Sequence, residues 1–397
     1  MTTVLCIASY EKGAEFMREC RRLGAHILFL TSERLRDADW PRDAIDAFYY
    51  LPSFGSRQEV LNAASYLARA RKIDRIVALD EFDQEMAAEL REHLRVPGMG
   101  QTTVRRFRDK LAMRQAAAEA GIPVPSFTAA FHDEEVRAWL ARVPGPWLLK
   151  PRGSAAAIGI RKVEREEQVW QAFEALGDLR ADHLLERFVP GSVCHVDAIV
   201  NEGRVVFDSA HAYADTPFQV AHAGGLFCSR SLERDSPEEV RLLNLNREVV
   251  TELGMVRGVV HTEFIRSEAD GRLVFLETAA RVGGAHIVDL VEAATGANLW
   301  REWARLEIAH ARGEAYSPPA RGEAYAGILI SLARQEQPDT SAFDDAEIVW
   351  RMNKRHHAGL IVASRDPDRV RALLDNYMPR FRDAFMAFMP APDRPTA

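Results

Sequence analysis

The sequence predicts an α/β protein with more than one domain, and three observations support this prediction. The chain has 397 residues, and at about 100–200 residues per domain this length implies two or three domains. Hydrophobic residues make up 47% of the chain and charged residues 27%, which is the balance of an ordinary globular protein. The first hundred residues alternate short apolar runs with helical patterns, which is typical of a parallel sheet covered by helices.

The elements of this first segment can be placed by their hydrophobic periodicity. We expect strands at 4–8, 25–30, 48–51 and 75–79, and helices at 13–23, 56–71 and 82–94. A dinucleotide-binding Rossmann domain requires a G-x-G-x-x-G turn after the first strand, whereas this turn contains only Gly13. The segment is therefore interpreted as Rossmann-like in architecture but without the signature of NAD binding.

The rest of the chain mixes helices with hairpin patterns, after a turn-rich boundary at 96–100. We expect helices at 102–120, 133–142, 164–176, 237–253, 285–294 and 297–311, and one from residue 367 onward. Strands are expected at 146–151, 183–189, 193–200, 204–209, 259–265, 273–278, 327–333 and 360–363. Residues 316–320 contain two prolines and are interpreted as a linker.

Composition argues against several classes of partner. The net charge is −7 and no basic block is present, so we expect no nucleic acid partner. Apolar runs such as 27–30 are far shorter than the ~20 residues of a membrane helix. The first residues lack the pattern of a secretory signal, and the four cysteines lack metal-site spacing. We therefore expect reduced thiols and a cytoplasmic location.

The strongest chemical feature is a hairpin predicted around residue 270. A three-residue loop at 269–271, with Gly271 in the left-handed conformation, places Glu263 directly opposite Glu277. Two like charges at ~5 Å destabilise a sheet, whereas a divalent cation between them would be bound by both. The same face is expected to carry His261, Ile265, Phe275 and Ala279. The alternative is a solvated sheet face, and a two-residue turn would break this register.

Two further segments have features of anion-binding sites. Lys150 ends a predicted strand and precedes a loop of small residues at 153–159, whose backbone N–H groups could surround a phosphate. The spacing is not that of a P-loop. Arg281 precedes Gly283, Gly284 and a predicted helix, and a helix N-terminus attracts anions. Each segment could instead be an ordinary loop or turn.

Taken in chain order, these segments resemble the ATP-grasp superfamily. The motifs are Asp109-Lys110, Leu149-Lys150-Pro151 with the following loop, and residues 185–191, 261–264 and 276–284. The resemblance covers most of the chain, with its core at 105–310. It implies an ATP-grasp fold with a Rossmann-like domain at 1–100, a small α+β lobe at 101–183, a large α+β lobe with the metal and substrate site at 184–316, and a small C-terminal subdomain at 317–397.

The resemblance also implies roles for individual residues. The residues implied to bind ATP are Lys110, Lys150, Ser154, Gly159, Glu186, Arg187, Phe188, Val189, His195 and Asp197. Within this set the lysines would bind phosphates, residues 186–189 would bind the adenine, and His195 or Asp197 would approach the ribose. Glu263 and Glu277 would hold Mg²⁺ or Mn²⁺, and Arg281 would stabilise the transferring phosphoryl group or the acyl phosphate. A substrate carboxylate would lie near Gly283 and Gly284.

Two positions depart from the pattern of the superfamily. Many members have Asn as a third metal ligand where this chain has Ala279, and an acidic residue near the ribose where this chain has Val193. The first departure implies altered coordination of one metal ion or a water in place of the ligand. Neither departure removes the two glutamates or the lysines, so an active enzyme is expected.

The segment 211–232 is the best candidate for a cover over the substrate. It contains His222, Gly224 and Arg230, which are candidate substrate residues. Long irregular segments inside compact domains are often functional lids. The alternative is an excursion that packs its aromatic side chains against the sheet.

The implied activity is that of an ATP-dependent carboxylate–amine ligase. It would form an amide or peptide bond through an acyl phosphate, release ADP and phosphate, and act on an amino acid or a small acid. The alternatives are an acid–thiol ligase or a carboxylase on the same scaffold, or a non-catalytic regulator that binds ATP. A homodimer is common among the proteins that the chain resembles.

Overall fold

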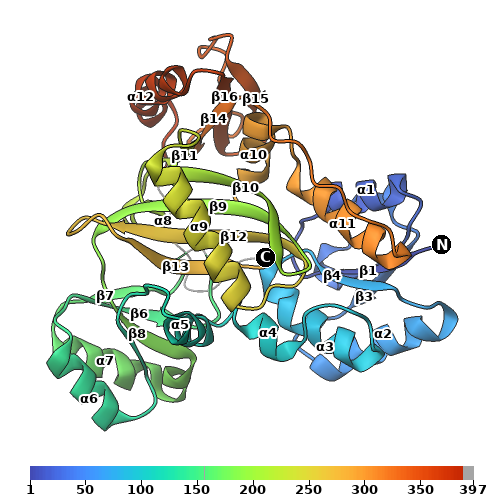
Figure 1. Cartoon of the computed structure of the whole chain (residues 1–397), viewed down its shortest axis with the longest axis horizontal. Coiled ribbons are helices and arrows are strands. Elements are labelled where there is room, and N and C mark those ends of the chain that lie inside the picture. Colours follow the sequence, from blue (N-terminus) through green and yellow to red (C-terminus); the bar gives the residue numbers. More distant parts are fainter. Residues whose placement is uncertain (156, 388–397) are drawn as a thin grey trace.

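The computed structural model describes residues 1–155 and 157–387. Over that part of the chain, the strands form three sheets, which Figure 1 shows in three regions of the molecule. The predicted alternation of strands and helices in the first hundred residues is confirmed. The same described ranges contain no helix with the length and apolar character that crossing a membrane requires.

The N-terminal sheet is parallel and is covered on both faces. Its strand order is β3 (Ala47–Leu51), β2 (His26–Ser32), β1 (Thr3–Ala8) and β4 (Arg75–Ala78). Alternate residues of β1 face opposite cores: Leu5 and Ile7 pack under α2 (Arg57–Ala70) and α3 (Gln84–Leu94), whereas Val4 and Cys6 pack under α1 (Ala14–Arg22) and α11 (Leu299–Arg312). Because both faces are covered, β1 is apolar nearly throughout and fully buried.

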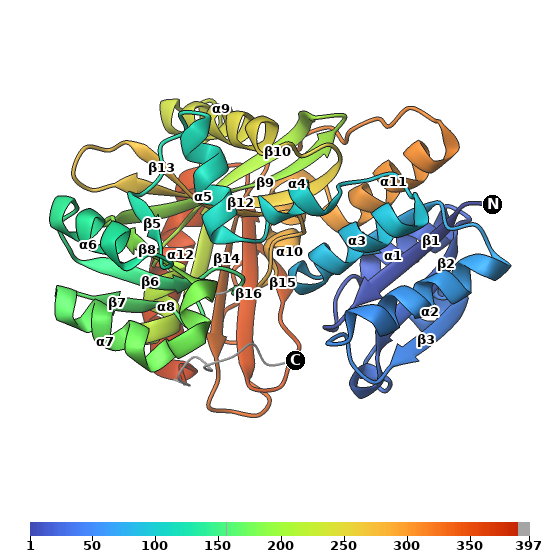
Figure 2. The same ribbon diagram turned by 90° about the horizontal axis from the view of Figure 1, so that it is seen from below.

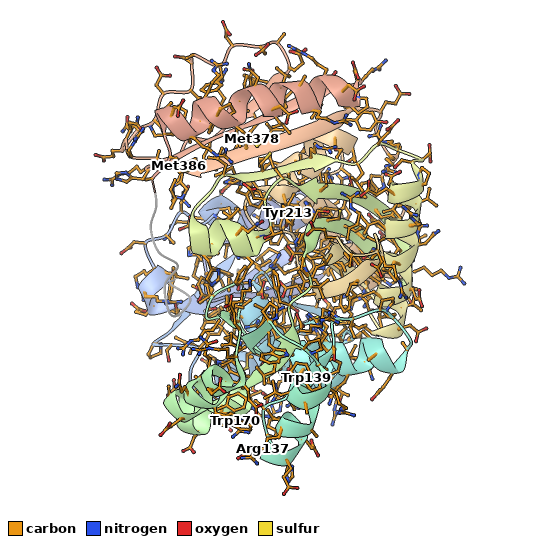
Figure 3. The ribbon with its side chains drawn as sticks, turned by 90° about the vertical axis from the view of Figure 1, so that its left-hand side faces the viewer. Arg137, Trp139, Trp170, Tyr213, Met378 and Met386 are labelled. Atoms are coloured by element: carbon orange, nitrogen blue, oxygen red, sulfur yellow. The ribbon has the colours of Figure 1, made fainter. Side chains whose placement is uncertain are left out.

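The small lobe is an antiparallel sheet with two helices. Its strand order is β5 (Phe127–Ala129), β8 (His183–Arg187), β6 (Trp147–Pro151) and β7 (Arg161–Val163), and the helices are α6 (Asp133–Arg142) and α7 (Glu166–Leu176). Trp139, Trp147 and Phe173 are buried between them. Figure 3 labels Trp139 and Trp170 in this lobe, and the Arg137 guanidinium lies 4.8 Å from the centre of the Trp170 ring. The sequence did not predict β5 or β7, because three residues are too few to show a periodicity.

The large sheet has eight strands and continues into the C-terminal residues. Its order is β13 (Leu273–Ala279), β12 (Gly258–Ser267), β9 (Gly191–Asn201), β10 (Arg204–Tyr213), β11 (Phe227–Ser231), β14 (Tyr325–Leu332), β16 (His357–Ser364) and β15 (Ile348–Arg351). The pairing of Cys228 with Leu329 joins β11 to β14. Residues 316–317, the expected boundary of a C-terminal subdomain, therefore separate two parts of one sheet.

Helices cover this large sheet, as Figures 1 and 2 show from two directions. The helix α9 (Pro237–Glu252) packs on β9 and β10, while α10 (Ile287–Thr295) and α12 (Pro367–Ala384) pack on β14 and β16. The other expected boundary, after residue 183, falls at the start of β8, which belongs to the small sheet. The chain passes from one sheet to the other at residues 188–190.

The predicted helix 102–120 is wrong in one respect, because the chain has two helices there. These are α4 (Gln101–Arg105) and α5 (Lys110–Glu119). The Asp109 carboxylate caps α5 by accepting a hydrogen bond from the Leu111 N–H at 2.9 Å. Asp is a favoured residue at this position because it satisfies a backbone donor of the first turn. The break places Lys110 at the start of α5.

The prediction that residues 211–232 form an irregular segment is also largely wrong. Its two ends are strands, because β10 extends to Tyr213 and β11 begins at Phe227. Between them lies the short helix α8 (Pro217–Ala223), which is capped by Thr216. Only the middle of the segment therefore remains available to cover a site.

Candidate functional site

A cavity of about 1300 Å³ is lined by residues of the small and large sheets, by connecting loops, and by segments that follow strands of the N-terminal sheet. Ten of the residues expected from the sequence line it: Lys110, Lys150, Ser154, Glu186, Phe188, Val189, Glu263, Glu277, Arg281 and Gly284. The cavity also receives residues of α8 and of the N-terminal unit, the part of the chain that contains β1–β4. Cavities of this kind, mostly apolar with a few converging polar groups, are the usual form of small-molecule sites.

The two glutamates of the β12–β13 hairpin face each other as predicted, but for a reason that the sequence analysis missed. Glu263 pairs with Glu277, and Gly271 has the expected left-handed conformation with φ +69°. The loop is longer than three residues, because the Ser267 N–H bonds to the Arg272 carbonyl at 2.9 Å. A bulge at Leu276 then restores the register.

The bulge makes one expectation for this hairpin wrong. Phe275 pairs with Phe264 rather than lying on the face of Glu263, and the two ring centres are 5.9 Å apart in a separate core. His261 and Ala279 do pair with each other, next to the glutamates. A single extra residue reverses the side-chain direction in the strand that carries it, so on β13 only positions beyond the bulge follow the predicted alternation. Ile265 lies on β12, which has no bulge, and it lines the cavity with Glu263 as expected.

Glu263 is fixed by hydrogen bonds in the wall of the cavity. It accepts a hydrogen bond from the Tyr213 hydroxyl at 3.0 Å, and His261 Nε2 lies 3.5 Å from the same carboxylate. Burial alone would raise the pKa of Glu263, but His261 outweighs it and the pKa is lowered. The carboxylate therefore stays charged although it is buried.

Glu277 is more exposed than Glu263 and pairs with Lys110. Its carboxylate lies 3.1 Å from Lys110 Nζ, which also donates to the Ser154 carbonyl at 2.6 Å. Opposed carboxylates that both reach a cavity are suitable ligands for Mg²⁺, which is bound in proteins by one or two carboxylates together with substrate phosphates. The residues present thus fit a divalent cation, and Lys110 compensates part of their charge.

A buried three-residue cluster connects the small lobe to α5. The Glu186 carboxylate bonds to Lys150 Nζ through one oxygen and to Arg114 Nε at 2.7 Å through the other. Burial lowers the pKa of Lys150, and Glu186 opposes this only in part. Burial would raise the pKa of Glu186, but the two cations outweigh it and keep the carboxylate ionised.

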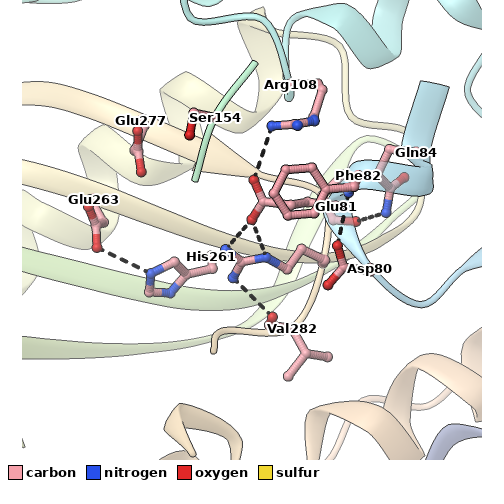
Figure 4. Close-up of polar contacts among 12 residues, drawn as sticks. Asp80, Glu81, Phe82, Gln84, Arg108, Ser154, His261, Glu263, Glu277 and Val282 are labelled. Carbon is pink, nitrogen blue, oxygen red and sulfur yellow. Dashed lines mark hydrogen bonds and ion pairs between the residues drawn. The ribbon is translucent and has the colours of Figure 1, made fainter. Parts of the chain in front are cut away.

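Arg281 is held by a glutamate of the N-terminal unit. Glu81 accepts a hydrogen bond from Arg281 Nε at 2.8 Å. Figure 4 shows that the same carboxylate also bonds to Arg108. Burial would raise the pKa of Glu81, but the Arg281 and Arg108 guanidinium groups outweigh it and hold that pKa at about 2. Nearby, Gln84 Nε2 donates to the Ala280 carbonyl at 2.9 Å. The segment that carries Arg281 is thus fastened to the N-terminal unit.

His195 and Asp197 are fully buried and do not reach the cavity. Asp197 accepts hydrogen bonds from His195 Nδ1 at 2.7 Å and from His261 Nδ1 at 2.9 Å. Burial alone would lower the pKa of His261, but Asp197 and Glu263 raise it to about 9. The expected ribose contact is therefore corrected: these two residues lie behind Glu263 and support it through His261.

Several other expected residues lie outside the cavity wall. These are Gly159, Arg187, His222, Gly224, Arg230 and Gly283. A Cβ on Gly283 would come within 2.9 Å of Asp197 Oδ1, so this glycine permits close packing on the buried cluster. His222 Nε2 lies 3.1 Å from the Ile160 carbonyl and connects α8 to the small lobe. Of the loop expected around phosphate, Ala156 lies outside the described residues.

The cavity residues of the N-terminal unit were not predicted from the sequence. Tyr10 and Lys12 follow β1, while Glu81 and Phe82 follow β4. All four lie just beyond the carboxyl ends of parallel strands, where ligands bind in open α/β sheets. That rule could have found them, because it needs only the predicted strand ends and no motif.

Such a fold and site define a class of proteins in which a ligand cavity lies between a small antiparallel lobe and a larger sheet. Residues 107–285 match the family model described as ATP-grasp domain, and this part of the chain is therefore assigned to that family. The solved L-amino acid ligase from Bacillus licheniformis has the same fold, with a TM-score of 0.74, 18% identity and 98% of each chain covered.

Curated relatives named as ligases also match parts of the chain. An L-arginine-specific L-amino acid ligase of Bacillus subtilis is 25% identical over 242 residues, which are 59% of this chain and 58% of that protein. A D-alanine–D-alanine ligase of Neisseria gonorrhoeae (strain NCCP11945) is 23% identical over 180 residues, 44% of this chain and 59% of that protein. The chain thus spans a little over half the length of these relatives.

Proposed function

We propose that the chain is an ATP-dependent ligase that joins the carboxylate of an amino acid or small acid to an amine. The observation that carries this proposal is the joint position of Glu263, Glu277, Lys110, Lys150 and Arg281 in one cavity. Phosphoryl transfer depends mainly on positioning and charge neutralisation, and these residues supply both. The names of the relatives, which include L-amino acid and D-alanine–D-alanine ligases, support the same reaction class.

In the proposed reaction, the carboxylate oxygen of the acid attacks the γ-phosphorus of ATP and ADP leaves. The amine then attacks the acyl carbon of the resulting acyl phosphate, inorganic phosphate leaves, and the amine loses a proton. Lys110 and Lys150 would bind the ATP phosphates, and Phe188 and Val189, which line the cavity, would contact the adenine. Arg281 would bind the acid and the developing charge.

Glu263 and Glu277 would hold Mg²⁺, which when bound neutralises the phosphate oxygens. Glu263 is already oriented by Tyr213 and by His261. Position 279 offers only a methyl group beside this pair, so a third ligand would have to come from water or from phosphate.

The test is to identify the nucleotide products. The full chain is incubated with Mg-ATP and pools of amino acids, small acids and amines, and ADP, AMP, phosphate and pyrophosphate are separated. ADP and phosphate that require both an acid and an amine would support the proposal. AMP with pyrophosphate would contradict the acyl phosphate. A requirement for a thiol would indicate an acid–thiol ligase, and a requirement for bicarbonate would indicate a carboxylase. ATP binding without turnover would indicate a regulator that binds ATP.

A further inference from the structure

Arg114 is a buried cation beside the proposed nucleotide site that has no role so far. It lies on α5, one turn after Lys110, with none of its surface exposed, and it is not among the residues that line the cavity. Its Nε donates to Glu186 at 2.7 Å. Within the described residues, its Nη1 and Nη2 have no hydrogen-bond partner. Burying an arginine with so few hydrogen bonds is costly, so its charge needs an explanation.

That explanation lies in the carboxylate that Arg114 shares with Lys150. Lys150 bonds to the other oxygen of Glu186 and is part of the cavity wall, so Glu186 has one cation on the cavity side and one on the inner side. The cluster carries two positive charges and one negative charge, and its net positive charge faces a cavity proposed to hold phosphates.

Without Arg114, Lys150 and Glu186 would form a neutral pair with little attraction for an anion. Moving Lys150 toward a phosphate would then leave Glu186 buried without a counter-ion, which is strongly unfavourable. With Arg114 in place, Glu186 keeps one cation when Lys150 turns away.

We propose that Arg114 is a positioning residue for ATP: it holds Glu186 from the inner side and so allows Lys150 to exchange Glu186 for a nucleotide phosphate. This inference rests on the proposed function, in which Lys150 contacts ATP. Arg114 acts through Glu186 and Lys150 and touches no substrate.

The experiment is a double-mutant cycle read by ligand binding rather than by turnover. Dissociation constants for ATP are measured by calorimetry, and those for adenosine by ligand-observed NMR, on the full chain and on Arg114→Met, Glu186→Gln and the double variant. We expect Arg114→Met to weaken ATP binding about 10-fold or more while adenosine binding changes less than about 3-fold. In the Glu186→Gln background, where no carboxylate holds Lys150, the same substitution should change ATP binding less than about 3-fold.

Two controls separate this role from a loss of folding. Arg91→Met removes another buried arginine, one that bonds to the Ile76 and Met99 carbonyls of the N-terminal unit, and should leave the ratio of ATP to adenosine affinity unchanged. Arg114→Lys retains the charge and should retain most of the ATP affinity, which also provides a test if Arg114→Met does not fold.

Several outcomes would overturn the inference. One is an equal loss of ATP and adenosine binding in Arg114→Met, and another is an equal effect of this substitution in the wild-type and Glu186→Gln backgrounds. Loss of ATP binding in Arg114→Lys would also do so. A wild-type chain that binds ATP normally but shows no ligase turnover would instead contradict the proposed function and leave the role of Arg114 intact.

Discussion

Replacing Glu81 with Gln would test the contact between the N-terminal unit and the segment that carries Arg281. The pKa of Glu81 is about 2, against 4.5 for an ordinary glutamate. Burial would raise this pKa, but the Arg281 and Arg108 guanidinium groups lower it by more. At about 1.4 kcal/mol per pH unit, this difference corresponds to about 3 kcal/mol in favour of the folded state at pH 7. The side chain is 10% exposed, so screening by solvent reduces this value little.

The pH dependence of the effect has a definite sign. Because the pKa of Glu81 is lower in the folded chain, its contribution is fully present above pH 4.5 and is lost as the pH falls through 4.5 toward about 2. The difference in unfolding free energy between the wild type and Glu81→Gln should therefore fall from about 3 kcal/mol at pH 7 to about 2 kcal/mol at pH 3.5.

The assay is urea denaturation followed by tryptophan fluorescence at both pH values. The control is Glu336→Gln, which breaks the exposed pair of Glu336 with Arg355 and should cost less than about 1 kcal/mol. A Glu81→Gln effect no larger than that of the control, or one that does not decrease at low pH, would refute the reasoning.

Three further predictions concern the site and the thiols. Glu277→Ala should abolish turnover and Mg²⁺-dependent nucleotide binding because a metal ligand is lost, and near-normal kinetics would remove it from the metal site. Lys150→Met should raise the KM for ATP at least about 10-fold, and an unchanged saturation curve would exclude the phosphate contact. The double variant Cys194→Ser, Cys228→Ser should keep most of the turnover, since both thiols are buried away from the cavity wall. Loss of activity in a folded variant would indicate a thiol mechanism.

The sequence was sufficient for most of the long strands and helices and for the paired glutamates, but not for short strands such as β5 and β7. Long strands and helices have enough residues to show a hydrophobic period, and the charged pair Glu263 and Glu277 is conspicuous inside an apolar hairpin. The register was predicted with the wrong loop, and the bulge at Leu276 compensated for that error. A bulge leaves no mark in hydrophobic periodicity until its partner strand is known.

The contacts made across the three sheets could not be read from the sequence. Glu81 and Arg281, which bond to each other, are 200 positions apart in the sequence, and no local sequence pattern can predict a contact at that separation. The same holds for Arg114 and Glu186, 72 positions apart. For His195 and Asp197 the sequence predicted a contact that is absent. Their positions in the motif suggested that they approach the ribose, but both side chains are fully buried.

The continuity of the large sheet from β13 to β15 also determines where the chain could be truncated. A chain ending after α11 would lose β14, and the backbone N–H and C=O groups of β11 that now bond to it would be left at an open edge. Open edges of this kind readily pair with other chains and promote aggregation. The strands β14, β16 and β15 therefore cover the hydrogen-bonding groups of β11 as well as part of the core, and we expect a chain without them to aggregate.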